Sequence, residues 1–158
     1  MKWLTLVLLF IPATAFAQAQ PPVDLEKEKA ELLRLHRSGR EAHFKTDVEL
    51  LLADSPEEYV GVRAGKISRS TKAGARKMFT EYFRGAKYYE WDDLEEPIIR
   101  VSKDGSMAWM ITRVRVRRVQ KDKAGAEVEE KFVYAGLRTY EKQGGKWMRA
   151  ANASTFEP

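Results

Sequence analysis

The spacing of the apolar residues changes once along this sequence, and that change constrains the fold more than any other feature. Up to about Arg84 most apolar residues recur with the period of about 3.6 residues that is typical of amphipathic helices. Beyond that point they alternate with polar residues, as in strands that have one buried face. Helices therefore come first and an antiparallel sheet follows. Because each must bury an apolar face, the sequence predicts an α+β domain in which a curled sheet wraps around a long N-terminal helix.

The longest helical pattern runs from Leu25 to Leu52, and Asp24 stands in the position of its N-cap. Three titratable residues interrupt its apolar face: His36, His43 and Asp47. His43 and Asp47 are four residues apart, so a continuous helix brings their side chains together. A histidine oriented by a carboxylate is suited to act as a general base, and a self-satisfying buried pair is the structural alternative. The two residues are too few to define a metal site, and none is predicted.

The other elements follow from shorter signals. Two strands, Tyr59 to Arg63 and Lys66 to Ser68, flank a tight turn at Ala64-Gly65. Ser70-Thr71 caps a second helix that runs to about Arg84, and its apolar stripe consists of Ala75, Met78, Phe79, Tyr82 and Phe83. The later strands are predicted at 88–93, 98–102, 107–120, 127–141 and 146–155.

The strand at 107–120 has two different faces. One face carries Met110, Thr112, Val114 and Val116 and is expected to look inward. The other face carries Trp109, Ile111, Arg113, Arg115 and Arg117. An exposed tryptophan and isoleucine beside arginines predict a homodimer interface with the arginines at its rim. Packing under the loop before Pro97, or an anion site on the arginine row, are the alternatives.

The last two strands supply candidates for a cavity wall. In a regular final strand Asn152 and Ser154 share one face, which we expect to line the cavity, and Trp147 lies on the opposite face as a core or interface anchor. Tyr134 and Arg138 share a face of the preceding strand and are assigned no role beyond the pocket mouth.

The N-terminal segment indicates export. Met1-Lys2, the apolar run from Trp3 to Ile11 and Ala15-Phe16-Ala17 have the order of a signal peptide over residues 1–17. Residues 18–23 are a short linker and residues 24–156 are the domain, so we expect a periplasmic or secreted protein without a membrane anchor after cleavage. The chain has no cysteine, and its formal net charge of +5 is spread along the sequence, which disfavours nucleic-acid binding.

Three stretches, in this order and spacing, resemble the nuclear transport factor 2-like, or SnoaL-like, superfamily, in its branch of small bacterial domains without an assigned function. They are His43 to Leu51, Tyr59 to Ile67, and the closing strands with Arg138-Thr139-Tyr140, Gly145-Lys146-Trp147 and Ser154. The resemblance implies a cone-shaped α+β barrel of the cystatin-like architecture, with a pocket between the first helix and the concave sheet. It implies no particular reaction.

Three functional hypotheses follow. The first is an exported domain that binds a small, partly apolar molecule through His36, His43, Asp47, Thr112, Asn152 and Ser154. The second is an acid–base enzyme of the isomerase, dehydratase or cyclase kind that uses His43 and Asp47. The third is an interaction module that acts through its sheet face. No cofactor is predicted for any of them.

Overall fold

The computed structural model describes residues 22–122 and 124–157, so the predicted signal peptide and most of the predicted linker lie outside the described residues. Within this part of the chain, no helix is long and apolar enough to cross a membrane. In chain order the elements are α1 (Leu25–Lys45), α2 (Val48–Leu51), β1 (Glu58–Arg63), β2 (Lys66–Thr71), α3 (Lys72–Phe83), β3 (Lys87–Asp93), β4 (Ile98–Val101), β5 (Met107–Lys121), β6 (Glu127–Gln143) and β7 (Lys146–Glu157).

The first helix begins as predicted but ends earlier. Asp24 caps it by accepting a hydrogen bond from the Lys27 N–H at 3.0 Å. The prediction of one helix to Leu52 was wrong, because Thr46 adopts a left-handed backbone conformation (φ 51°) that ends α1. Asp47 then caps the separate helix α2 by accepting a hydrogen bond from the Leu50 N–H at 2.9 Å. A short acidic side chain that bonds to nearby backbone amides favours such a break.

The hairpin and the second long helix follow the predicted order. Ala64 and Gly65 both have positive φ (49° and 74°), as a two-residue hairpin turn requires. The return strand β2 extends to Thr71, which is also the N-cap of α3. Of the predicted apolar stripe of α3, Ala75 and Phe83 are buried, but Met78 is exposed, because this helix faces a cavity along part of its length.

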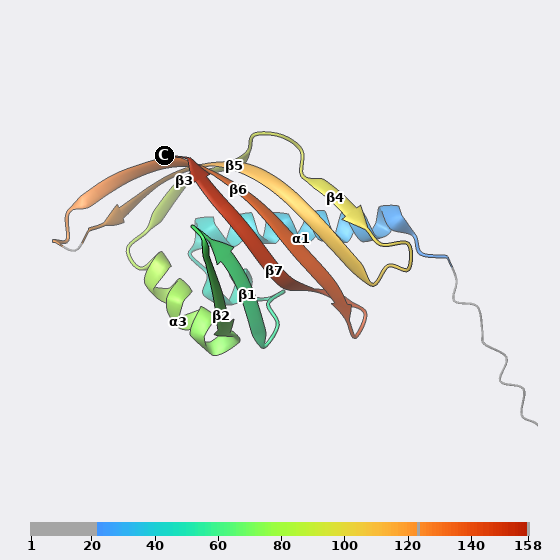
Figure 1. Ribbon diagram of the computed structural model, residues 1–158. Coiled ribbons are helices and arrows are strands. Elements are labelled where there is room, and N and C mark those ends of the chain that lie inside the picture. Colours follow the sequence, from blue (N-terminus) through green and yellow to red (C-terminus); the bar gives the residue numbers. More distant parts are fainter. Residues whose placement is uncertain (1–21, 123, 158) are drawn as a thin grey trace, which may run out of the picture.

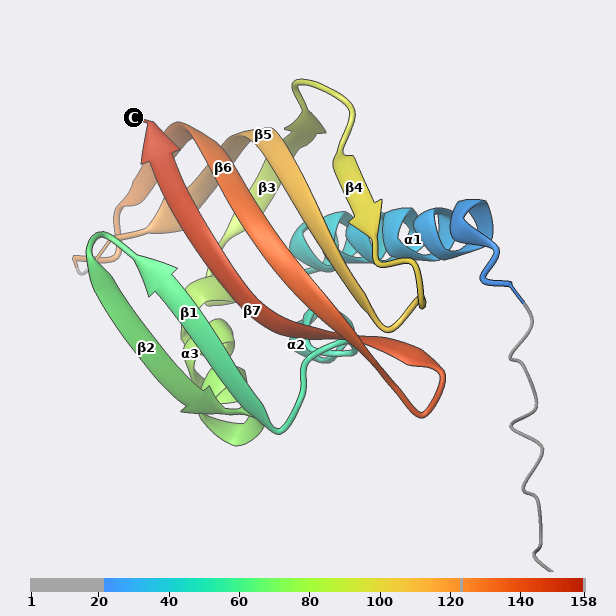
Figure 2. The ribbon, with the colours of Figure 1, turned by 45° about the vertical axis from the view of Figure 1, so that its right-hand side comes forward.

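The seven strands form one curled, open sheet with the order β2-β1-β7-β6-β5-β3, and β4 pairs with β5 beside this path. All neighbouring pairs are antiparallel except β1 and β7, which run parallel and join the N-terminal hairpin to the C-terminal strand. Both long helices lie on the concave side of the sheet (Figure 1 and Figure 2). The sequence predicted the curled sheet around the helix, and the structure leaves that sheet unclosed.

Two clusters of buried residues fill the space between the helices and the sheet. One contains Leu32, Ile99, Ala108, Met110, Tyr140 and Trp147. The other contains Ala42, Leu51, Phe83, Tyr88, Trp91, Val114, Val116 and Tyr134. Along β5 the even-numbered residues from 108 to 118 are buried, which confirms the predicted inward face, while Trp109 and Ile111 are exposed on the other side.

Candidate functional site

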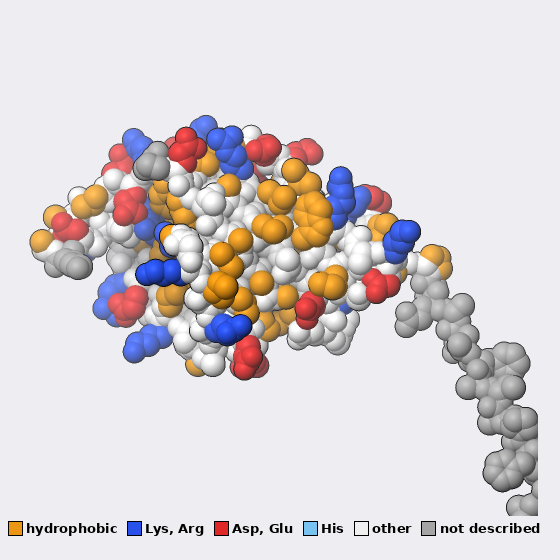
Figure 3. All heavy atoms as spheres, in the orientation of Figure 1, with side chains coloured by type: hydrophobic (Ala, Val, Ile, Leu, Met, Phe, Trp, Pro, Cys, Tyr) orange, Lys and Arg blue, Asp and Glu red, His pale blue; other side chains and the backbone are white. Residues whose placement is uncertain are grey.

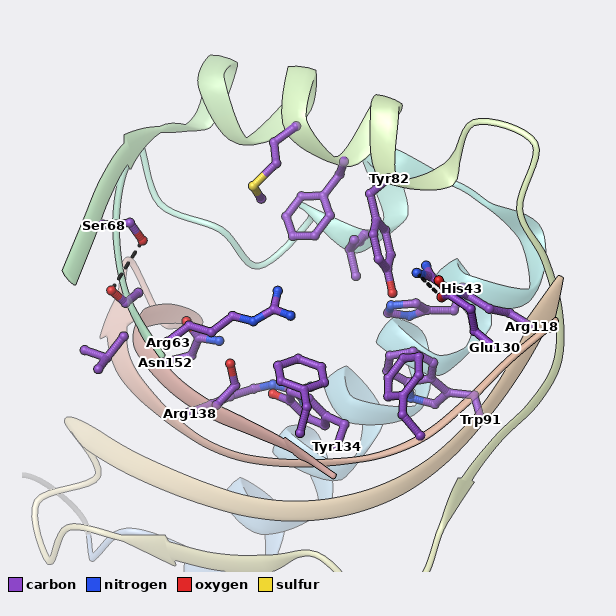
Figure 4. Close-up of a pocket in the computed structure, with 18 of the residues that line it drawn as sticks. His43, Arg63, Ser68, Tyr82, Trp91, Arg118, Glu130, Tyr134, Arg138 and Asn152 are labelled. Carbon is purple, nitrogen blue, oxygen red and sulfur yellow. Dashed lines mark hydrogen bonds and ion pairs between the residues drawn. The ribbon is translucent and has the colours of Figure 1, made fainter. Parts of the chain in front are cut away.

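A pocket of about 910 Å³ lies between the concave face of the sheet and α3. Its walls come from α1, α2, α3 and from strands β1, β2, β3, β5, β6 and β7. Figure 4 shows two ends of this pocket: Ser68, Arg63 and Asn152 lie at one end, and His43, Tyr82 and Trp91 lie at the other. A volume of this size fits a small organic molecule.

His43 belongs to the aromatic end of the pocket. Its ring stacks on Trp91, with ring centroids 3.5 Å apart and planes 22° apart, and Tyr88 and Phe83 contact it edge-on. His43 Nδ1 donates a hydrogen bond to the Gly39 carbonyl oxygen at 2.7 Å. Burial lowers the pKa of His43 to about 3. The imidazole is therefore neutral at physiological pH, and its Nε2 is a hydrogen-bond acceptor.

Asp47 does not meet His43, which overturns the predicted pair. The break at Thr46 rotates the chain, so that the Asp47 carboxylate caps α2 instead of lying one helical turn above the imidazole. Asp47 does not line the pocket either. The continuous-helix spacing on which the general-base hypothesis depended is absent from the structure.

His36 lies behind the pocket wall. Its Nε2 donates to the Asp93 carboxylate at 2.9 Å, and its Nδ1 is 3.4 Å from an Arg138 guanidinium nitrogen. A guanidinium only donates, so Nδ1 accepts and His36 is neutral in this arrangement. Burial is the main cause that lowers the pKa of His36, and the positive charge of Arg138 adds to it. His36 thus positions a pocket residue and is not itself part of the lining.

Thr112 was predicted to line the cavity, but it is buried beneath the lining. Its strand partner is Gly136 on β6, and a Cβ atom at Gly136 would collide with the Tyr134 hydroxyl group. The missing side chain at Gly136 therefore makes room for the Tyr134 ring on the concave face. The Thr112 hydroxyl has no hydrogen-bond partner among the described residues.

Asn152 and Ser154 do line the pocket. A register shift between β6 and β7 pairs Thr139 with Ala151 but Tyr140 with Arg149, which leaves one extra residue in β7. This bulge moves Trp147 and Arg149 onto the same concave side as Asn152, whereas a regular strand would place Trp147 and Asn152 on opposite faces. The predicted separation of these two residues was therefore wrong.

Five cationic side chains line the pocket: Arg63, Arg118, Lys131, Arg138 and Arg149. Of these, only Arg138 was predicted from the sequence, as a residue of the pocket mouth. Arg118 donates to Glu130 and to the Tyr88 hydroxyl oxygen, at 2.8 and 2.9 Å. Arg149 forms an ion pair with the buried Asp54. Lys131 pairs with Glu129 at 3.2 Å. The alternation of inward and outward residues places Arg118 and Arg138 on inward faces, so the sequence could have identified them as pocket residues. It does not identify Arg149, because the bulge in β7 interrupts the alternation there.

The four predicted interface residues lie away from the pocket. Trp109, Ile111, Arg113 and Arg115 are exposed on the convex face of β5. Figure 3 shows hydrophobic side chains gathered over the outer surface of the sheet. Among the described residues, no group of three or more His, Cys, Asp or Glu side chains is placed to hold a metal ion.

No protein-family model matches the sequence, and no curated protein matches it. Solved structures do match. A ketosteroid isomerase-like protein from Erwinia carotovora atroseptica SCRI1043 has a TM-score of 0.63 and 16% identity, over 84% of this chain and 98% of its own. A second match, from Cytophaga hutchinsonii ATCC 33406, is a nuclear transport factor 2-like protein with a TM-score of 0.62 and 15% identity, over 80% of this chain and 96% of its own.

A third match is a protein of unknown function with a cystatin-like fold from Nostoc punctiforme PCC 73102, with a TM-score of 0.59 and 18% identity over 82% of this chain and 91% of its own. At such low identity these matches show the fold alone. They agree with the architecture that the sequence resemblance implied.

Proposed function

We propose that this chain, which has the nuclear transport factor 2-like fold, is an exported domain that binds a small, partly apolar molecule in its pocket. The observation that carries the proposal is a pocket of about 910 Å³ whose aromatic residues include Phe79, Tyr82, Trp91 and Phe156. Aromatic and aliphatic walls with a few polar groups are typical of small-molecule sites. The acid–base alternative loses its support because His43 hydrogen-bonds to the Gly39 carbonyl oxygen and the Asp47 carboxylate accepts from the Leu50 N–H, so the two side chains do not form a pair.

An uncharged aromatic dye, N-phenyl-1-naphthylamine, tests the pocket directly. Ser154 lines the pocket and Thr155 is the next residue on the other side of the same strand. Ser154→Phe fills part of the pocket and is expected to weaken dye binding at least tenfold. Thr155→Phe adds the same ring outside the pocket and should leave the affinity within twofold. Equal dye affinity of both variants, measured by fluorescence titration, would contradict binding in this pocket.

Mass spectrometry of the native protein identifies a resident ligand. Protein purified without denaturant is unfolded in organic solvent, and the released small molecules are compared with those released by Ser154→Phe. We expect a compound that the parent protein retains and the variant lacks. The same compounds in both preparations would count against a ligand in the pocket.

Export rests on the sequence of residues 1–17. The mature chain is expected to begin at Gln18, or at Gln20 if cleavage follows Ala19. N-terminal sequencing of protein from the periplasm or the medium checks this expectation. Recovery of the protein from the cytosol with Met1 in place would contradict it.

The convex face of the sheet supports a second proposal, a homodimer. Ile98, Ile111 and Leu137 are partners in one row across β4, β5 and β6, with exposed fractions of 44%, 40% and 39%. Three adjacent exposed aliphatic residues beside Trp109 form an apolar patch of the kind that a self-complementary interface covers. A second copy of this chain is the expected partner.

Sedimentation velocity at micromolar concentration tests the dimer. Trp109→Glu places a charge in the patch and should give a folded monomer. Tyr89→Glu is the matched control, because Tyr89 is an exposed aromatic residue on β3, outside the aliphatic row. A monomeric parent protein at this concentration would overturn the proposal.

A further inference from the structure

We propose that the ligand of this pocket is an organic carboxylate with a planar apolar body, and that Arg138 and Arg63 bind the carboxylate group. The inference rests on the proposed function, since it concerns the same pocket. It goes further by naming the chemical class of the ligand and the residues that recognise its charge. The charges of the lining, the surroundings of Arg138, and the aromatic character of the opposite end each support it.

The lining carries more positive than negative charge. Arg118, Lys131 and Arg149 each have a carboxylate partner within 4.0 Å. Glu129 and Glu130, the two carboxylates of the lining, are both engaged in these pairs. Among the described residues, Arg63 and Arg138 have no carboxylate within the same distance. The pocket therefore holds two guanidinium groups whose charge no side chain of the described chain neutralises by direct contact.

Arg138 is the better buried of the two. It lies on β6 opposite Asn152 of β7 and is partly buried, whereas Arg63 is exposed. Its guanidinium meets two neutral side chains, the His36 Nδ1 at 3.4 Å and the Tyr134 hydroxyl group. The imidazole separates Arg138 from the Asp93 carboxylate, and Asp54, which is paired with Arg149, acts on Arg138 only from beyond 4.0 Å. Burying a charge without a counter-charge in direct contact is costly, and an anionic ligand in the pocket reduces this cost.

His36 gives Arg138 a defined orientation. The Asp93 carboxylate fixes the ring by accepting from Nε2 through both of its oxygens, at 2.9 and 3.0 Å. The lone pair of Nδ1 then accepts from Arg138, which engages one of the five N–H donors of the guanidinium. The Tyr134 hydroxyl oxygen accepts from a second donor, and the others are available to the pocket. A planar fork of donors matches the two oxygens of a carboxylate, which explains the preference for this anion.

Arg63 approaches from the other wall of the same end. Its guanidinium carbon is 4.1 Å from the centre of the Phe156 ring, so the side chain is held over an aromatic surface. Figure 4 shows Arg63 and Asn152 next to each other at this end of the pocket. The Asn152 amide supplies a further neutral donor. Together these groups form a cationic end in a pocket whose other end is aromatic.

The aromatic end is suited to a planar apolar group. Trp91 and the neutral His43 present stacked rings, and Tyr82 and Phe79 border the same space from α3. Because His43 is uncharged at neutral pH, this end has no free cation that competes for the carboxylate, and Arg118 is already paired with Glu130. The ligand is thus expected to enter with its charge toward Arg138 and its flat body toward Trp91.

A matched pair of probes tests the charge. We expect 2-naphthoate to bind at least tenfold more tightly than 2-naphthamide at pH 7.5, measured by titration calorimetry. Arg138→Gln should weaken naphthoate binding tenfold or more and leave the amide within twofold. Arg63→Gln should weaken naphthoate binding about threefold, because Arg63 is exposed and its charge is screened by solvent.

Arg115→Gln is the matched control. Arg115 is exposed on the convex face and has no carboxylate within 4.0 Å among the described residues, so its replacement removes the same charge outside the pocket. Naphthoate affinity within twofold of the parent value is expected. An equal loss in this variant would mean that the net charge of the protein, and not the pocket, attracts the anion, and would overturn the inference.

The remaining outcomes separate this inference from the proposed function. Equal affinities for acid and amide in the parent protein would overturn the carboxylate inference while pocket binding stands. Tenfold tighter binding of 2-naphthyl phosphate than of naphthoate would overturn the choice of anion. If neither the naphthyl probes nor the uncharged dye bind, the proposed function falls as well. If Arg138→Gln does not fold, the acid–amide ratio in the parent protein and its change in Arg63→Gln decide.

Discussion

The concave face of the sheet has a closed half and an open half, although strands β5, β6 and β7 run through both. In the closed half α1 lies against the sheet, and Leu32, Met110, Tyr140 and Trp147 pack into a core without access to solvent. In the open half α3 replaces α1 as the cover, and a pocket of about 910 Å³ remains beneath it. Along the three shared strands, the difference comes from the helix that covers them.

The two halves also treat their polar groups differently. In the closed half Glu28 accepts hydrogen bonds from Lys142 and from the Trp147 indole nitrogen, so the charges are satisfied within the chain. In the open half Arg63 and Arg138 have no such carboxylate among the described residues. Where helix and sheet exclude water, buried charges must be paired by other groups of the chain. Where helix and sheet leave a pocket, solvent or a ligand can pair with these charges instead.

The largest expected effect is a loss of stability in the closed half. Trp147 is 3% exposed and packs among Leu32, Met110 and Tyr140. Trp147→Ala should lower the free energy of unfolding by about 3–5 kcal/mol, because it removes a large buried ring and one of the two hydrogen-bond donors to Glu28. Phe132→Ala in the open half should cost about 1–2 kcal/mol, since this ring already borders empty space. Urea unfolding measures the loss of stability in each variant. Equal losses would contradict a difference in packing between the closed and the open half.

A smaller effect concerns the pH dependence of stability, and it tests whether the aromatic end of the pocket is dry. His43 has a folded-state pKa of about 3 because it is buried, against about 6.5 for an unfolded histidine. Its contribution to stability is complete above pH 6.5, where both states are neutral. As the pH falls below 6.5, the unfolded chain takes up a proton that the folded chain does not. Stability should then fall by up to ~1.4 kcal/mol per pH unit, down to about pH 3.

His43→Gln isolates this contribution, because His36 and all carboxylates remain in the variant. We expect the variant to be less stable than the parent protein at pH 7.5 and to approach its stability at pH 4.5. Chemical unfolding at several pH values measures the difference. Parallel curves would indicate that His43 titrates normally and that water reaches the aromatic end of the pocket.

The smallest expected effect tests whether Asp47 acts only as the cap of α2 or also contributes to the neighbouring pocket. Asp47→Ala removes the hydrogen bond to the Leu50 N–H and should cost about 1 kcal/mol of stability. Dye binding should stay within twofold, because Asp47 does not line the pocket. Asp24→Ala at the start of α1 is the matched cap variant, far from the pocket. A tenfold loss of dye affinity in Asp47→Ala, but not in Asp24→Ala, would show that Asp47 contributes to ligand binding.

The sequence by itself determined the order of the elements and much of their local chemistry. Asp24 as a helix cap, the turn at Ala64-Gly65 and the inward face of β5 depend on residues a few positions apart, so spacing alone predicts them. The exposed Trp109 and Ile111 follow from the same alternation. The fold class follows as well, because helices and a one-sided sheet have few ways to cover each other's apolar faces.

Only the tertiary structure decided the site. The break at Thr46 separates Asp47 from His43, and the bulge in β7 brings Arg149 to the same side as Asn152. A single inserted residue reverses every inward and outward assignment beyond it, and no local pattern marks that residue in advance. Arg138 has a role only because His36 from α1 and Asn152 from β7 meet it. The partner of Arg138 on α1 lies 102 positions away in the sequence, and the order of the chain does not reveal this contact.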